Sequence, residues 1–218
     1  MSYLTRIVLS LIVGLWFSTI VVAGDVGAAA SVVQPSSADP KQFVQDITDS
    51  LLSRLQGHQE EMRSDPHRIY ALVETLVLPH FDFERMSRWV LGQHWNEATP
   101  AQRTRFIAEF RNLLVRTYGV ALLNYTDEKI QFLPSRGDPA KGEVTVRANI
   151  RHHGNTINID SDLYKKDGEW KVYDIAIEGV SLVANYRNSF ANEIRDGGMD
   201  GLISKIATRN QGTDGKKG

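Results

Sequence analysis

Apolar residues in the first half of the chain recur at three- and four-residue spacing, which is the periodicity of an amphipathic helix. Two Asp-Pro pairs, at 39–40 and 65–66, each place a capping residue beside a proline that suits a first helical turn. Pro79 stops the second of these helices, and Gly92 closes a third that begins at Asp82. The pattern predicts helices over residues 40–60, 66–78 and 82–91.

The longest predicted helix begins in the segment ATPAQ. Thr99 stands at the capping position, Pro100 at the first helical position and Gln102 three residues after the threonine, which together form a capping box. This helix is expected to span about residues 99–125. Its apolar face carries Phe106, Phe110, Leu113, Leu114, Tyr118, Leu122 and Tyr125.

The apolar period changes to two at Thr126, which indicates β-strands. A short strand is expected around Ile130 and Phe132, and a loop over 136–142. Strict alternation then predicts three longer strands that pair as an antiparallel meander. These strands cover 143–150, 156–164 and 170–178, joined by turns at 153–155 and 166–168.

Helical spacing returns over about 180–195, and a short helix at 199–208 follows the Gly197-Gly198 break. Helices, then a meander, then helices predict an α+β domain. We expect N-terminal and C-terminal helices packed on a curved, mainly antiparallel four-stranded sheet, with residues 39–208 as one domain. The polar tail, 209–218, is expected to be disordered.

Composition narrows the class of protein. The chain has 218 residues, of which 42% are hydrophobic, and a formal charge of -1, which suits a globular domain and disfavours nucleic-acid binding. Cysteine is absent, so the chain has no disulfide framework, no thiolate metal site and no lipid-modified cysteine.

The N-terminus has the layout of a secretory signal. Arg6 precedes an apolar run at 7–23, and small residues offer cleavage after Ala23 or Ala30. We therefore expect a signal and cleavage region at 1–30, a linker at 31–38 and an exported protein. The alternative is an uncleaved anchor, because 17 apolar residues lie at the short limit of a membrane-spanning helix.

Motifs for catalysis are scarce. Ser181 has only one of the two flanking glycines of a nucleophile elbow, and we find no phosphate-binding loop, dinucleotide fingerprint or His-Glu-x-x-His. His152 and His153 are adjacent on a strand and point to opposite faces, so a solvated pair is simpler than a metal site. Asp160 and Asp162 share a face and form either paired carboxylates or part of a wet surface.

Two further sets of charged residues have alternative interpretations. Asp174 and Glu178 lie in an apolar stretch where desolvation would raise a carboxylate pKa, as in an enzyme. They alternate out of phase with the apolar positions, however, so we expect them to face away from the interior. The second set is a solvated helix surface or a docking site for an acidic partner or anionic membrane: Arg103, Arg105, Arg111 and Arg116.

The segment YDIAIEGVSLVANYRNSF, residues 173–190, carries apolar residues across a predicted strand-to-helix junction. Together with the 99–125 helix and the inward sides of the strands, it directs three apolar stripes toward one interior. Each position alone fits a packed core. Several of these residues are tyrosines, whose hydroxyls need partners when buried, and this favours positions near the mouth of a cavity.

Four segments in this order and spacing resemble the MlaC or toluene-tolerance family of Gram-negative periplasmic phospholipid carriers. They are VLPHFDFERMSRWVLGQHW, ATPAQRTRFIAEFRNLLVRTYGVALLNY, YDIAIEGVSLVANYRNSF and GGMDGLISKI. The resemblance covers about 39–208 and implies a helix-covered sheet, related to NTF2-like folds, around a deep apolar cavity. It implies no catalytic residue, no metal and no cofactor other than phospholipid as cargo.

The resemblance also implies partners. These are phospholipid, an outer-membrane lipoprotein–porin complex and an inner-membrane ABC transporter with an MCE-domain subunit, served by a monomer that binds no nucleic acid. A diacyl phospholipid exposes roughly 30 methylenes, so its escape into water costs on the order of 20 kcal/mol. A carrier must therefore replace the bilayer with a pocket. An NTF2-like enzyme and an adaptor that binds no lipid are the alternatives.

The hypothesis assigns residues 173–183 to the wall of the tail cavity and Tyr186 and Arg187 to its rim. A glutamate at Ile175 or Val146 should then abolish lipid carriage in a folded protein. The full set of expected cavity residues is Phe110, Leu114, Tyr118, Tyr125, Val144, Val146, Ala148, Ile150, Ile157, Ile159, Tyr173, Ile175, Ile177, Val180 and Val183.

Overall fold

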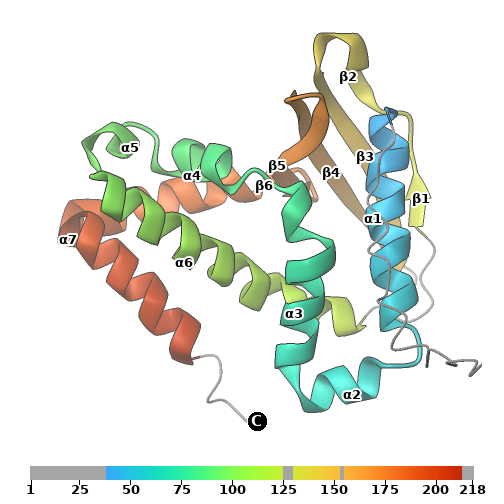
Figure 1. The fold of residues 1–218 in the computed structure, drawn as a ribbon, viewed down its shortest axis with the longest axis horizontal. Coiled ribbons are helices and arrows are strands. Elements are labelled where there is room, and N and C mark those ends of the chain that lie inside the picture. The colour runs from blue at the N-terminus through green and yellow to red at the C-terminus, as the bar shows by residue number, and fades with distance from the viewer. Residues whose placement is uncertain (1–37, 125–129, 153–154, 213–218) are drawn as a thin grey trace, which may run out of the picture. The chain divides into compact units, whose positions relative to one another are not determined.

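The computed structural model describes residues 38–124, 130–152 and 155–212, all within the compact unit Val33–Gly218 (Figure 1). The expected signal region lies outside the described residues. Within the described ranges, no helix is long and apolar enough to cross a membrane.

The N-terminal helices begin where the Asp-Pro pairs predict. The Asp39 side chain accepts a hydrogen bond from the Lys41 backbone (3.0 Å), and Asp65 accepts one from His67 (3.2 Å). The first helix ends earlier than expected, because Gly57 adopts a positive φ of 78° two residues after it. The elements are α1 (Pro40–Leu55), α2 (Gln59–Ser64), α3 (Pro66–Leu76) and the 3₁₀ turn η1 (Leu78–His80).

The middle helices follow the capping signals. Asp82 caps α4 (Phe83–Leu91), and Thr99 and Gln102 form the predicted capping box of α6 (Pro100–Gly119). A short helix between them, α5 (His94–Glu97), was not predicted. After Gly119 the chain tightens into the 3₁₀ segment η2 (Val120–Asn124).

The sheet is antiparallel, with strand order β1-β3-β4-β5-β6 and with β2 also paired to β3. It has six strands, whereas the sequence predicted four, because β2 was taken for a loop and β6 for the start of a helix. Two-residue turns at Asp167-Gly168 and Glu178-Gly179, all with positive φ, join the later strands. The strands are β1 (Ile130–Phe132), β2 (Arg136–Asp138), β3 (Glu143–His152), β4 (Asn155–Lys166), β5 (Glu169–Ile177) and β6 (Val180–Ser181), with the turn η3 (Pro139–Lys141) after β2.

A β-bulge changes the face of one predicted cavity residue. Asp162 pairs with Asp174, and Leu163 pairs with Val172, so Tyr173 is the extra residue on β5. Strict alternation put Tyr173 beside Ile175, but the bulge separates them.

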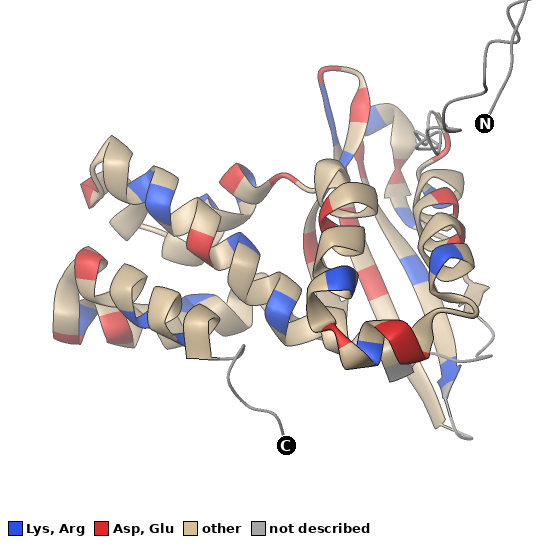
Figure 2. Cartoon of the chain, turned by 60° about the horizontal axis from the view of Figure 1, so that its bottom comes forward, with Lys and Arg blue, Asp and Glu red and all other residues tan. Residues whose placement is uncertain are grey.

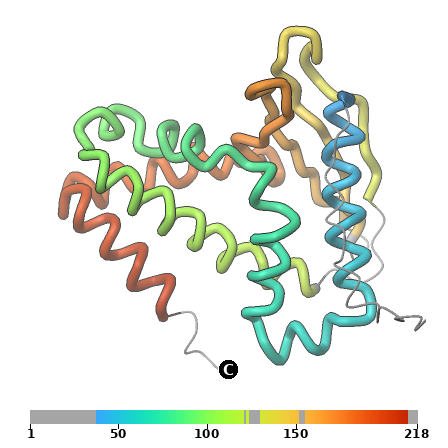
Figure 3. Tube along the Cα trace, viewed as in Figure 1, coloured from blue at the N-terminus to red at the C-terminus, as the bar shows by residue number. Residues whose placement is uncertain are grey.

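The last helix, α7 (Leu182–Gly212), is broken at Gly198, whose φ is 66°, as the Gly197-Gly198 pair predicts. It runs four residues past the expected end at 208. Figures 1 and 3 show α7 folding back beside α6 after the break, at a distance from α1 and the strands.

Three groups of buried side chains stabilise this arrangement. The helical cluster consists of Met86, Val90, Leu91, Trp95, Phe106, Phe110, Leu113, Leu114, Val183, Tyr186, Phe190, Leu202, Ile203 and Ile206. The sheet cluster joins α1 to the strands through Phe43, Ile47, Val144, Val146, Leu163, Trp170 and Val172. The α1–α3 cluster consists of Leu51, Leu55, Ile69, Val73, Leu78, Val115 and Leu123.

Candidate functional site

One face of the sheet is mostly apolar, with the buried Ser161 as a polar residue at its centre. Cross-strand partners share a face, so the pairs Val144–Leu163, Ala148–Ile159 and Ile159–Ile177 place the β3, β4 and β5 side chains together. The alternation predicted this face correctly for β3 and β4. After the bulge, β5 adds Ile175 and Ile177 to the same face.

The helices cover this face unequally. At the end nearest the β4–β5 turn, α1 closes it: Val144 is 4% exposed, Val146 1% and Leu163 0%. Toward the other end of β3 and β4 the aliphatic side chains are only half-buried, and Val180, opposite Ile177, is 57% exposed. We call the half-buried set the half-covered face: Ala148, Ile150, Ile157, Ile159, Ile175 and Ile177.

The predicted cavity residues from the helices lie elsewhere. Phe110, fully buried, packs edge-on against Tyr186 (5.3 Å between ring centroids) and Phe190 (6.0 Å). Leu114 and Val183 belong to the same helical cluster. The apolar stripe of α6 therefore packs on α4 and α7, and the structure does not bring it to the sheet face.

The predicted rim residues, Tyr186 and Arg187, and the predicted cavity residue Tyr118 also lie in different surroundings. Tyr118 is half-buried against the helical cluster, where burial and the neighbouring Tyr186 raise its pKa. Tyr186 is itself 8% exposed, so it is a core residue. Arg187 is exposed and lies against Gly92 at the end of α4. Tyr125 lies outside the described residues.

Half-buried apolar residues also border the buried clusters, and two of them, Leu52 and Val77, were missed by the sequence analysis. Phe132 and Ile175 pack against the sheet cluster, Leu52 and Leu122 pack against the α1–α3 cluster, and Val77 packs against both. Each helical member lies next to a fully buried residue in sequence, at the border of an apolar stripe. An apolar residue at the border of a buried stripe is therefore expected to be partly buried, and a search for the central stripe alone does not find it.

Asp174 pairs with Asp162 on the face of the sheet opposite Ile175 and Ile177, as expected, but it is buried there, at 7% exposure. Its carboxylate accepts hydrogen bonds from the Ser181 hydroxyl and from the Val183 backbone (3.1 Å), at the start of α7. The Ser181 oxygen in turn accepts one from the Ala184 backbone (3.0 Å). Asp174 therefore serves as a helix cap supplied by a strand, which explains a buried carboxylate without catalysis.

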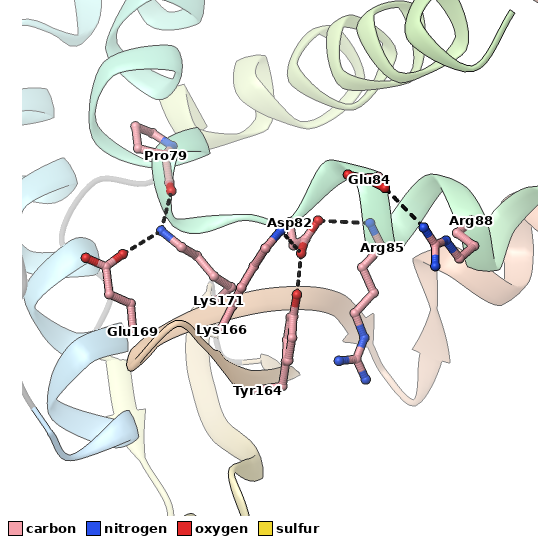
Figure 4. Close-up of polar contacts among 9 residues, drawn as sticks. All are labelled: Pro79, Asp82, Glu84, Arg85, Arg88, Tyr164, Lys166, Glu169 and Lys171. Carbon is pink, nitrogen blue, oxygen red and sulfur yellow. Dashed lines mark hydrogen bonds and ion pairs between the residues drawn. The ribbon is translucent and has the colours of Figure 1, made fainter. Parts of the chain in front are cut away.

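A second buried carboxylate fastens α4 to β4 (Figure 4). Asp82, 6% exposed, accepts hydrogen bonds from the Arg85 backbone (2.9 Å), the Lys166 ammonium (2.9 Å) and the Tyr164 hydroxyl. Burial alone would raise the pKa of Asp82, but the hydrogen bonds from Lys166, Tyr164 and the backbone outweigh it and lower the pKa. Burial and the bond to Asp82 raise the pKa of Tyr164.

Two pockets on the molecule are unrelated to the predicted cavity. One, of about 210 Å³, lies between α3 and α6. The other, of about 280 Å³, lies beside the β4–β5 turn and has Phe81 and Phe83 in its wall. None of the predicted cavity residues lines either pocket.

Figure 2 shows Lys and Arg positions interspersed with Asp and Glu positions along the helices and strands. The arginines of α6 make contacts within the chain. Arg103 donates to the Trp95 carbonyl (2.8 Å), Arg105 pairs with Asp200 (3.7 Å) and Arg116 stacks over Tyr70 (5.3 Å). These contacts favour a structural role over a docking site. Within the described ranges, no group of three or more His, Cys, Asp or Glu residues could hold a metal ion.

Comparison with known proteins places this arrangement in a family. The model of the MlaC protein family matches residues 45–208. The chain is 29% identical, over 177 residues, to the intermembrane phospholipid transport system binding protein MlaC of Haemophilus influenzae, covering 78% of this chain and 82% of the relative. It is 26% identical, over 194 residues, to the toluene tolerance protein ttg2D of Pseudomonas putida, covering 86% and 90%.

A solved structure has the same fold. It is a phospholipid-binding protein from Ralstonia solanacearum in complex with a phospholipid, with a TM-score of 0.76, 30% sequence identity, and coverage of 81% of this chain and 99% of that chain. The family match spans most of the chain, including the sheet, its half-covered face and α7. The chain therefore belongs to the MlaC protein family.

Proposed function

We propose that this protein carries phospholipid through the periplasm, between an outer-membrane lipoprotein–porin complex and an inner-membrane ABC transporter with an MCE-domain subunit. The half-covered face supports this most directly, because it holds aliphatic side chains in register that the chain's own helices leave partly exposed. Exposed aliphatic surface of this kind marks a binding site. Lipid tails are a suitable occupant, because they need contact area and no hydrogen bonds.

The relatives support the choice of ligand. The Haemophilus influenzae relative is named as the binding protein of an intermembrane phospholipid transport system, and the Ralstonia solanacearum structure contains a phospholipid. The signal-like segment at 1–30 supports a periplasmic location. The direction of movement would come from the membrane complexes, since the carrier itself makes and breaks no bond.

The test is mass spectrometry, under native conditions, of protein purified from a periplasm. The wild-type protein should arrive with bound phospholipid. Ile159→Glu places a charge on the half-covered face, where a solvated carboxylate excludes acyl chains, and should arrive empty. Thr156→Glu is the matched control, because Thr156 is exposed on the other face of the same strand.

Each outcome is informative. Lipid retained by Ile159→Glu at the wild-type level would contradict the proposed tail site. Lipid-free wild-type protein would indicate an adaptor, and consumption of a small molecule by the wild-type protein would indicate an enzyme. Val146→Glu is a poor test, because Val146 is 1% exposed and a buried charge there would unfold the protein.

A further inference from the structure

The helices α4–α7 and the sheet share little buried apolar surface. Each buried residue of the helical cluster lies in α4, α5, α6 or α7, and each of the sheet cluster lies in α1 or a strand. Phe81 is half-buried and packs against both clusters. Tyr173 is a half-buried strand residue that packs against the helical cluster. Other interactions must therefore help to hold the sheet against α4.

Arg85 of α4 reaches across this boundary. Its guanidinium lies over the ring of Tyr164 (3.9 Å to the centroid) and the ring of Tyr173 (4.2 Å), and pairs with Glu143 at 3.1 Å. The two tyrosine rings stand nearly perpendicular, 5.7 Å apart, and Trp89 approaches Tyr173 at 5.3 Å. The arginine thus joins one helix to β3, β4 and β5.

Asp82 fixes the helix end of the same boundary. Its backbone N–H donates to the Val172 carbonyl (2.9 Å), and its carboxylate accepts from Tyr164 and Lys166. Figure 4 shows Tyr164 and Lys166 reaching Asp82 from the sheet, while Arg85 extends past Tyr164 from the first turn of α4. Asp82 therefore anchors the start of α4, and Arg85 acts one turn farther along, where a rotation of the helix displaces it more.

We propose that Arg85 is a positioning residue that latches the sheet to α4 and thereby slows the release of lipid. A turn of the sheet about the Asp82 anchor would break the cation–π contacts and the ion pair of Arg85, while the buried residues of the helical cluster and of the sheet cluster stay on their own sides of the boundary. Arg85, Tyr164 and Tyr173 are half-buried, so breaking their cation–π contacts costs more than at an exposed site but less than exposing a buried cluster. The contacts of Arg85 therefore oppose a turn of the sheet relative to α4. The effect on lipid rests on the proposed function, whereas the effect on sheet position does not.

The chain lacks cysteine, so paired spin labels can report sheet position directly. Cysteines at Ala108, exposed on α6, and Lys165, exposed on β4, give one distance across the boundary. The distance distribution should be narrow in the parent protein and broader in Arg85→Ala. Arg85→Lys keeps the charge but loses the planar group, and should be intermediate. Arg105→Ala is the control, because Arg105 is exposed and pairs with Asp200.

Lipid transfer to acceptor vesicles gives the second measurement. Arg85→Ala should transfer lipid about fivefold faster, as the loss of such contacts implies, while Arg105→Ala stays at the parent rate.

Parent-like distances in both Arg85 variants would overturn the latch. A broadened distance with unchanged transfer would overturn its role in lipid release. Protein that never carries lipid but shows the broadened distance would contradict the proposed function and leave the latch in place. If Arg85→Ala does not fold, Arg85→Lys decides.

Discussion

The helical cluster and the half-covered face contain the same kinds of residue and differ in how completely the chain covers them. Phe106, Phe110 and Ile203 are 0% exposed, with aromatic rings packed on one another. Ile157, Ile159 and Ile177 share one face of the sheet and remain half-buried. In the helical cluster the chain itself buries the apolar side chains fully, whereas on the half-covered face it leaves them partly exposed. Completeness of burial, more than hydrophobicity, separates these core positions from the positions that we propose to bind apolar cargo.

The largest expected effect is on the complete region. Phe110→Ala removes a ring that packs on Tyr186 and Phe190, and should lower the free energy of unfolding by about 3–5 kcal/mol. Urea unfolding measures this loss. The lipid bound per folded molecule should not change, because Phe110 lies away from the half-covered face. Lipid loss in the folded fraction would mean that the helical cluster lines the cavity after all.

A pair of substitutions on one strand sharpens the comparison. Leu163 and Ile159 lie on the same face of β4, but Leu163 is 0% exposed and Ile159 is half-buried. Leu163→Ala should cost about 2–5 kcal/mol of stability, and Ile159→Ala roughly 1 kcal/mol in lipid-free protein. Lipid should stabilise the Ile159 variant less than the parent, as thermal unfolding with and without lipid would show. Equal losses of stability would remove the distinction between the two parts of the face.

Local patterns predicted most of the fold. The Asp-Pro pairs, the Thr99–Gln102 capping box and the Gly198 break all act over a few residues, so they can be recognised without the tertiary structure. The short strand Arg136–Asp138 was missed, because its polar, glycine-containing sequence forms a strand only by pairing with β3. Pairing of this kind depends on residues distant in sequence.

The site could be predicted only in part, because it too depends on contacts between residues that are distant in sequence. Periodicity shows which residues share a face, and this placed the aliphatic residues of β3 and β4 together. It does not show what covers that face, and so it could not show that Phe110, Leu114 and Val183 pack in the helical cluster. The bulge at Tyr173 also escapes periodicity, because it arises from the pairing of β5 with β4.

Substituting Asp82, which joins α4 to the sheet, should give a smaller effect that depends on pH. Asp82→Asn weakens the bonds to Lys166 and Tyr164 and should cost about 1–3 kcal/mol at neutral pH. The pKa of Asp82 is lowered in the folded protein, so its stabilisation is present above the ordinary aspartate pKa and is lost as the pH falls through the lowered value. The difference in urea stability between parent and variant should therefore shrink below about pH 4. A difference that stays constant through this range would show that the charge of Asp82 is not what holds the boundary.

The smallest expected effect lies where the sheet leads into α7, and it tests whether Asp174 and Ser181 cap that helix. Ser181→Ala removes the acceptor for the Ala184 N–H and the donor to Asp174, and should cost about 1 kcal/mol. Ser189→Ala, at an exposed position inside the same helix, should change stability by less than about 0.5 kcal/mol. Lipid content should follow the parent in both variants, because the cap stabilises α7 without contributing to the half-covered face. If Ser181→Ala lost lipid while keeping its stability, Ser181 would belong to the binding site, and the separation between the two regions would have to be redrawn at β6.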